Sequence, residues 1–192
     1  AFKGDKEVVL AAVKQICFAF TYALESLQSN RSFVLDVVRQ NGLALQYAVA
    51  FKGDKEVVLA AVQQSGLALQ HASQELKADK EVVLAAVQQN GGGICFIQGA
   101  LLIDRGVFLA AVQQNGWALG WAQEDLQKDL EVVLAAVQQN GSSLQYASEG
   151  LKEDRKVVLA AVQNNGNALQ YAAAFKGDKE VVLAAVKQIC FA

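Results

Sequence analysis

The chain has 192 residues, of which 53% are apolar and 19% are charged, and it contains neither proline nor methionine. Its 17 lysines and arginines against 19 aspartates and glutamates leave a net charge of −2, which argues against nucleic acid as a partner because a phosphate backbone attracts a broad basic surface. No run of 18 apolar residues occurs, so we expect no transmembrane segment. Proline breaks helices, and its absence from an alanine-rich chain predicts an all-α protein.

A pattern of 24 or 25 residues repeats along the chain. The string Glu-Val-Val-Leu-Ala-Ala-Val begins at Glu7 and returns with few changes, and an aspartate or asparagine stands two positions before each copy. These residues start the repeats, near Asp5, Asn30, Asp54, Asp79, Asp104, Asp129, Asp154 and Asp178. We therefore expect residues 1–192 to form a single array of seven complete repeats and half of an eighth.

Each repeat begins with a predicted helix of about eleven residues, as the fourth repeat illustrates. Asp79 is placed to cap the helix N-terminus, and Glu81 favours the positive end of the helix dipole. The apolar run that begins at Val82 ends before Asn90 and Gly91. We expect this glycine to adopt the left-handed conformation that often closes a helix C-terminus.

A second, shorter helix is predicted in each repeat, with the pattern Ala-Leu-Gln-Tyr-Ala at residues 44–48 and 168–172. A leucine such as Leu76, Leu126 or Leu151 then packs back before the next aspartate. The first helix is apolar almost all round and too short to be stable alone in water, so each repeat needs its neighbours. The expected fold is an α-solenoid of about seven and a half helix–turn–helix repeats.

The pattern Asp-Lys-Glu-Val-Val-Leu-Ala-Ala-Val-Gln-Gln-Asn-Gly-x-Ala-Leu-Gln-Tyr-Ala-Ser resembles the helical repeat family called domain of unknown function 4116. It departs from the family pattern where Ile16-Cys17 and Ile189-Cys190 replace Asn-Gly, and in the glycine-rich stretch 91–96. The resemblance implies a helical repeat and carries no activity, catalytic residue or cofactor. The family occurs in intracellular bacteria and unicellular algae, which implies a host cytosol or a plastid, whereas the three cysteines by themselves favour a reducing intracellular compartment.

The residues that most often carry chemistry have simpler structural explanations here. The repeated aspartates lie one per repeat, too far apart to share a metal ion, and His71 has no second histidine beside which to bind one. Glycines 91–93 lack the Lys-Ser/Thr ending of a phosphate loop. Each cysteine stands in an Ile-Cys-Phe string, an apolar setting that raises the pKa of a thiol. We therefore expect no enzyme, no metal site and no cofactor.

Two kinds of side chain recur once per repeat and form columns. Glutamines end most of the first helices, and we expect them to hydrogen-bond between repeats; a polar groove is the alternative. Rings occupy one position of the second helix, and we expect them to be partly buried; a ligand-facing ladder is the alternative. The columns are Gln15, Gln40, Gln64, Gln89, Gln114 and Gln139, and Tyr22, Tyr47, His71, Phe96, Trp121, Tyr146 and Tyr171.

One region departs from the repeat in a way that suggests a contact surface. Leu102 and Ile103 stand where other repeats have Lys-Ala or Lys-Glu before the aspartate, and the next repeat adds Phe108, Trp117 and Trp121. Two tryptophans four residues apart lie on one face of a helix, and exposed apolar patches often bind proteins. We interpret these five residues as partner-binding, with local repacking around the neighbouring glycines as the alternative.

The two ends of the chain are unusual because residues 1–19 and 174–192 are identical. The final apolar residues include Ile189 and Phe191, which we assign to self-assembly. The chain is then either a segment of a longer array or a subunit that assembles head to tail. The favoured function is a non-enzymatic scaffold for protein–protein interaction. The alternative is a structural or linker subunit of a larger assembly, either a head-to-tail filament or a membrane-associated complex.

Overall fold

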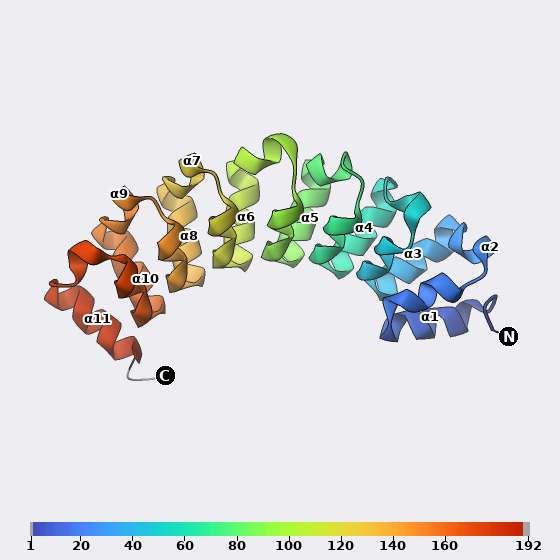
Figure 1. The fold of residues 1–192 in the computed structure, drawn as a ribbon, viewed down its shortest axis with the longest axis horizontal. Helices are drawn as coiled ribbons and strands as arrows, with labels where there is room; N and C mark the ends of the chain where they lie inside the picture. Colours follow the sequence, from blue (N-terminus) through green and yellow to red (C-terminus); the bar gives the residue numbers. More distant parts are fainter. Residues whose placement is uncertain (1, 190–192) are drawn as a thin grey trace. The chain divides into compact units, whose positions relative to one another are not determined.

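The computed structural model describes residues 2–189, and its regular elements in this range are all helices. The chain divides into two compact units, Ala1–Gly99 and Ala100–Ala192, which are described separately below. Stacked helical repeats build each unit, which confirms the expected all-α solenoid fold (Figure 1). That residues 1–192 form one continuous array stays a prediction.

Each repeat begins with an α-helix of ten or eleven residues. An aspartate or asparagine side chain accepts hydrogen bonds from backbone N–H groups in the first turn of each, so the predicted N-caps at all eight repeat starts are confirmed. These first helices are α1 (Lys6–Gln15), α3 (Arg31–Gln40), α4 (Lys55–Gln64) and α5 (Lys80–Gln89) in unit 1, and α6 (Arg105–Gln114), α8 (Leu130–Gln139), α10 (Arg155–Asn164) and α11 (Lys179–Ile189) in unit 2.

The second helix of each repeat is a 3₁₀-helix of five or six residues. Its length is limited because the hydrogen-bond geometry of a 3₁₀-helix is poorer than that of an α-helix. These helices are η1 (Cys17–Tyr22), η2 (Gly42–Gln46), η4 (Gly66–His71) and η6 (Gly91–Phe96) in unit 1, and η8 (Gly116–Trp121), η9 (Gly141–Tyr146) and η10 (Gly166–Tyr171) in unit 2.

A short third element leads from each repeat to the next cap. In five repeats it carries the predicted leucine, and Leu27, Leu76, Leu101 and Leu126 are all at most 8% exposed, whereas Leu151 is half-buried. A phenylalanine, Phe51 or Phe175, takes this position in the other two. The third elements are α2 (Glu25–Gln28), η3 (Val49–Phe51), η5 (Leu76–Ala78), η7 (Gly99–Ile103), α7 (Glu124–Gln127), α9 (Glu149–Lys152) and η11 (Ala173–Phe175).

The expectation that glycine closes the first helix in a left-handed conformation is wrong. Within residues 2–189 only Gly99 has a positive φ. The residue that follows each first helix from α1 to α10 is extended instead, as Asn140 shows with φ −149° and ψ 109°. The glycine that comes next is required by packing. A Cβ at Gly141 would collide with the carbonyl oxygen of Ala161 in the next repeat, and a Cβ at Gly66 would collide with the carbonyl oxygen of Ala86.

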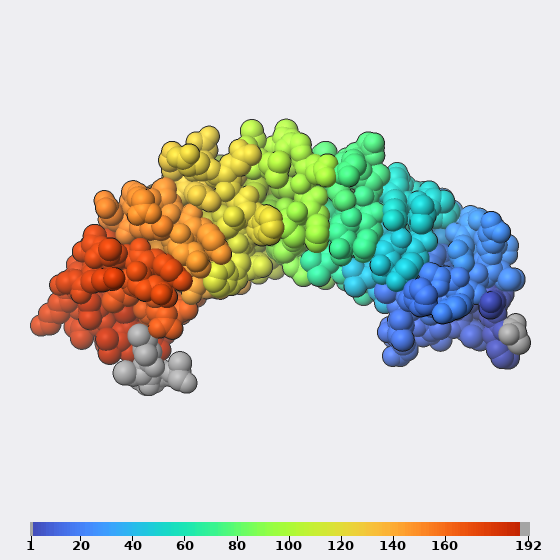
Figure 2. Space-filling model, viewed as in Figure 1, coloured from blue at the N-terminus to red at the C-terminus, as the bar shows by residue number. Residues whose placement is uncertain are grey.

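The core of each unit consists of the inner faces of these helices. In unit 1, α4 packs between α3 and α5, and η4 packs between η2 and η6. In unit 2, α8 packs between α6 and α10, and η9 between η8 and η10. Neighbouring repeats of a unit lie directly against each other in the space-filling view (Figure 2). Among the described residues, no helix is both long enough and apolar enough to cross a membrane.

Candidate functional site

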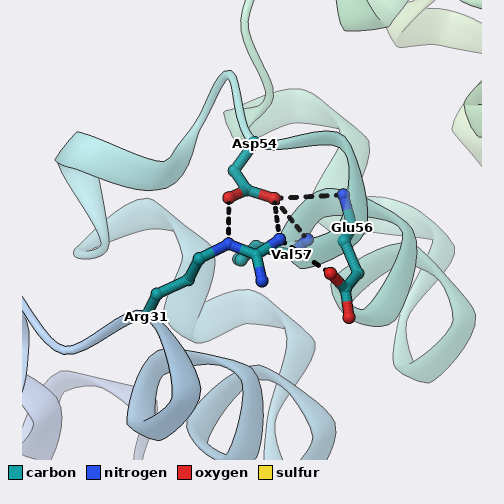
Figure 3. A network of polar contacts seen from close by, with 4 residues as sticks. All are labelled: Arg31, Asp54, Glu56 and Val57. Carbon is teal, nitrogen blue, oxygen red and sulfur yellow. Dashed lines mark hydrogen bonds and ion pairs between the residues drawn. The ribbon is translucent and has the colours of Figure 1, made fainter.

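A ladder of ion pairs joins the N-terminal ends of neighbouring first helices. The first residue of α3, Arg31, donates from Nε to Asp54 Oδ2 at 2.6 Å and from Nη2 to Glu56 Oε2 at 2.7 Å (Figure 3). The same Asp54 carboxylate accepts from the backbone N–H groups of Glu56 and Val57, which begin α4. One aspartate therefore caps its own helix and binds the preceding repeat.

Equivalent pairs recur in both units. Lys55 lies 2.8 Å from both Asp79 and Glu81 in unit 1, and Arg105 binds Asp129 and Glu131 in unit 2. A second contact of this kind in unit 2 joins α10 to α11, where Arg155 contacts the carboxylates of Asp178 and Glu180. A hydrogen bond from Arg31 holds the pKa of Asp54 below its usual range, and the two carboxylates together raise the pKa of Arg31.

The ladder changes wherever the next repeat lacks its acidic residue. Lys156 occupies the glutamate position in α10, and the residue that would face it from α8 is Leu130. Ser32 occupies that position in α3, and Lys6 lies over the Phe33 ring at 5.9 Å instead. The basic residue that follows most caps was not among our predictions, although its recurrence is visible in the sequence.

These pairs predict an acid-sensitive stability. The pKa of Asp129 lies below its ordinary value of 3.8, chiefly because Arg105 donates a hydrogen bond to it. A folded-state pKa that is depressed contributes stability above the unfolded pKa, and this contribution is lost as the pH falls through the folded value. In urea unfolding, Arg105→Gln should therefore be less stable than the wild type at pH 7, and the difference should shrink as the pH falls below 3.8.

A matched control is Arg39→Gln, because Arg39 faces Asp36 at 3.9 Å on the surface of its own helix. We expect its effect on stability to be small at every pH. An Arg105→Gln deficit that stays constant between pH 7 and pH 3 would contradict the prediction.

A second ladder runs through the glutamines at the ends of the first helices. Gln64 Oε1 accepts from the Gly42 amide at 2.6 Å, and Gln139 Oε1 accepts from the Gly116 amide at 2.6 Å. Gln139 also donates to the carbonyl oxygen of Gln114 at 3.3 Å. Hydrogen bonding between repeats is thus confirmed for Gln64, Gln89 and Gln139, and Asn164 performs the same function for the Gly141 amide.

The ring column on the 3₁₀-helices is partly buried, as expected, except at two positions. Tyr47, His71, Phe96, Tyr146 and Tyr171 are half-buried. Tyr22 and Trp121 are 58% and 62% exposed. Desolvation lowers the pKa of His71, and the positive charges of Lys52 and Lys77 lower it further.

The tryptophans of η8 form an exposed aromatic surface in unit 2. The exposed fractions are 43% for Trp117 and 62% for Trp121. Trp117 meets the Tyr146 ring edge to face, with ring centroids 5.9 Å apart. Gly120 makes this approach possible, because a Cβ there would lie 3.0 Å from the Tyr146 ring. An open groove lined by Tyr146, Glu124, Lys128, Glu149 and Lys152, among others, adjoins it.

Four of the five predicted partner-binding residues are exposed, and one is not. Leu102 is 37% exposed and Ile103 is 60% exposed, and the exposed fractions of the two tryptophans are similar. Phe108, in contrast, is fully buried. Phe108 follows Val107 in α6 and occupies the position of Val58 in α4, which is also fully buried. It therefore belongs to the core and cannot contact a partner.

Leu102 has a defined relation to the ring column. It occupies the repeat position of Lys52, one of the two lysines that act on His71, and Trp121 occupies the position of His71. The repeat before the one that contains Trp121 thus has an apolar residue at a position where the repeat before the one that contains His71 has a lysine. We call Leu102, Ile103, Trp117 and Trp121 the aromatic patch.

The remaining candidate residues have no shared site. Burial raises the pKa of the Cys95 thiol, and Cys95 and Cys17 are both free. In residues 2–189 no group of three or more His, Cys, Asp and Glu side chains is placed to hold a metal ion. Cys190 and Phe191 lie outside the described residues, as does the side chain of Ile189, so their predicted part in self-assembly stays a prediction.

Comparison with known proteins agrees with the repeat pattern. The family model described as "Domain of unknown function (DUF4116)" matches residues 5–48, 54–98, 104–152, 129–173 and 154–192. Searches of curated proteins and of solved structures gave no match.

Proposed function

The chain belongs to the DUF4116 family of repeats, and from this premise we propose that it is a non-enzymatic scaffold that binds other proteins. The aromatic patch carries this proposal. Trp117 and Trp121 are the only tryptophans of the chain, and both are exposed on one 3₁₀-helix. Tryptophan is the side chain most enriched among the residues that dominate binding energy at protein interfaces.

Two positions in and near the aromatic patch differ from the repeat pattern, and both differences make the surface less polar. At the Lys52 position the patch has Leu102, and at the Gln70 and Gln145 position of the 3₁₀-helix it has Gly120. Each change removes a polar side chain from the surface and leaves more ring or aliphatic area open to a partner. Charged rims around apolar centres are typical of protein interfaces, and Glu124, Lys128 and Glu149 supply such charges next to Tyr146.

The patch has a built-in reporter, because all tryptophan fluorescence of the chain comes from it. We would select peptides on the 192-residue chain from a displayed library of random 16-residue sequences. Peptides that bind the patch should shift the emission to shorter wavelength as they cover the rings. Trp121→Ala should weaken their binding at least about tenfold. Tyr22→Ala is the matched control, because Tyr22 is an exposed ring of the same column in the other unit.

The double substitution Leu102→Glu with Ile103→Lys is a separate prediction. Both side chains are exposed, so helicity measured by circular dichroism should be unchanged, while binding of the selected peptides should be abolished. Loss of helicity would place these residues in the core. Unchanged binding, or peptides that bind without shifting the emission, would remove the patch from the proposed function.

The second candidate function is a structural subunit that joins its own copies. It is favoured by the faces that the first and last helices expose, and these faces carry an inference of their own.

A further inference from the structure

Helices α1 and α11 share one sequence, Lys-Glu-Val-Val-Leu-Ala-Ala-Val-Lys-Gln, yet they expose opposite sides. α1 packs against α3 in unit 1, and there Val9 and Val13 are 6% and 0% exposed. On its other side, Val8 is 44% exposed and Ala12 is also exposed. Among the described residues no helix covers this side of α1 (Figure 1).

The pattern is reversed in α11, which packs against α10 and η10 in unit 2. Val181 and Ala185 occupy the positions of Val8 and Ala12, and they are 0% and 1% exposed. Val186 occupies the position of Val13 and is 48% exposed. The same amphipathic helix thus shows one half of its apolar surface at one end and the other half at the other end.

An inner helix shows what covers both halves. In α4, which lies between α3 and α5, the four residues Val57, Val58, Ala61 and Val62 are all fully buried. The Val57 and Ala61 side is therefore the one that receives the preceding repeat, and the Val58 and Val62 side is the one that receives the following repeat. Within the described residues, no helix provides the first contact for α1 or the second contact for α11.

The charges of the two faces are complementary as well. Between α4 and α5, Lys55 pairs with Asp79 and Glu81 at 2.8 Å. The equivalent cation on α11 is Lys179, and the equivalent acids on α1 are Asp5 and Glu7; none of these three makes an ion pair within residues 2–189. One like-charge pair opposes them, because Lys187 and Lys14 occupy the positions of Gln63 and Gln88, where both side chains are exposed and free to separate.

We propose that α11 of one molecule docks on α1 of a second copy and reproduces the contact between α4 and α5. Val182 and Val186 then cover Val8 and Ala12, and Lys179 binds Asp5 and Glu7 of the next molecule. The two surfaces are different, so the contact is heterologous and continues from copy to copy. This inference goes beyond the scaffold function and does not involve the aromatic patch.

The first measurement is light scattering coupled to gel filtration, from about 5 to about 500 µM, because a contact of one repeat is small and therefore weak. The mass of the wild-type chain should rise above 20.5 kDa with concentration. Val8→Glu blocks the α1 face and Val186→Glu blocks the α11 face, so each variant alone should stay at the mass of one chain. Circular dichroism checks that both remain helical.

The decisive experiment mixes the two variants. Each retains the face that the other has lost, so the mixture should form a species of twice the single-chain mass and nothing larger. Val49→Glu is the matched control, because Val49 is 72% exposed and lies on neither face, and this variant should associate like the wild type.

Three outcomes would overturn the proposal. They are a wild-type chain that stays monomeric at every concentration, a mixture that forms no dimer although both variants are folded, and a Val49→Glu chain that loses association like the other two. Since the peptide-binding test reads only tryptophan fluorescence in the patch, failure of one proposal does not carry over to the other.

Discussion

Gly141→Ala is expected to destabilise the protein by about 3 kcal/mol, because the added methyl group enters a space that the next repeat already occupies. A Cβ on Gly141 would collide with the carbonyl oxygen of Ala161 and lie 2.9 Å from the Asn165 amide nitrogen. Both obstacles are backbone atoms, so they cannot move aside as a flexible side chain would. The same residue donates its N–H to the Asn164 side chain at 2.7 Å, a bond that separation of the repeats would also break.

The matched control is Gly150→Ala. Gly150 lies within α9, and nothing stands within 4 Å of the position that its Cβ would take. Alanine is the better helix former by about 1 kcal/mol, so this variant should be slightly more stable than the wild type. Urea unfolding followed by circular dichroism measures both. A Gly141→Ala chain as stable as Gly150→Ala would show that the repeats can separate at this point without cost.

The helix starts could be predicted from sequence because capping is local. Asp79 acts on backbone groups two and three residues away, so its role depends on nothing that a single repeat does not contain. The glycine of the Asn-Gly pair was interpreted in the same local way and the interpretation was wrong. Glycine is required both by a left-handed cap and by the close approach of another helix. The sequence of one repeat does not tell which of the two reasons applies at Gly141, and only the fold shows that Ala161 approaches it.

The ion-pair ladder was missed because it joins residues that lie 23 to 26 positions apart. Its signal was nevertheless present in the repeat: a basic residue follows most caps, and where Lys156 replaces the acid, Leu130 replaces the base of the preceding repeat. Comparing the residue after each cap with the acidic residues of the following repeat would have predicted the contact. The faces of α1 and α11 could not be found in this way, since the two sequences are identical and only burial distinguishes them.

Phe108 shows the same lesson at the candidate site. It was grouped with Trp117 and Trp121 because all three are aromatic and close in sequence. Its column, however, includes Val34, Val58, Val83, Val133 and Val158, which are fully buried. An aromatic side chain can belong to a core or to a binding surface, so its type alone does not distinguish these roles. The burial of the equivalent residues in other repeats does distinguish them.

This distinction gives the second large effect. Phe108→Ala is expected to destabilise unit 2 by about 3 to 5 kcal/mol, because it removes a fully buried ring and leaves a cavity between packed helices. Phe108→Val restores the residue of the other repeats but also removes ring volume, so its loss should be smaller. Trp121→Ala, in contrast, truncates a ring that is 62% exposed, and its unfolding in urea should stay close to that of the wild type.

The two rings should therefore separate stability from binding. At a temperature where both variants are folded, Phe108→Val should bind the selected peptides as the wild type does, while Trp121→Ala should not. If Phe108→Val weakened peptide binding in proportion to the stability it loses, the patch would depend on the packing of the core for its binding. Binding that depends on Trp121 alone, at unchanged stability, is the result expected of an interaction surface carried on a rigid repeat.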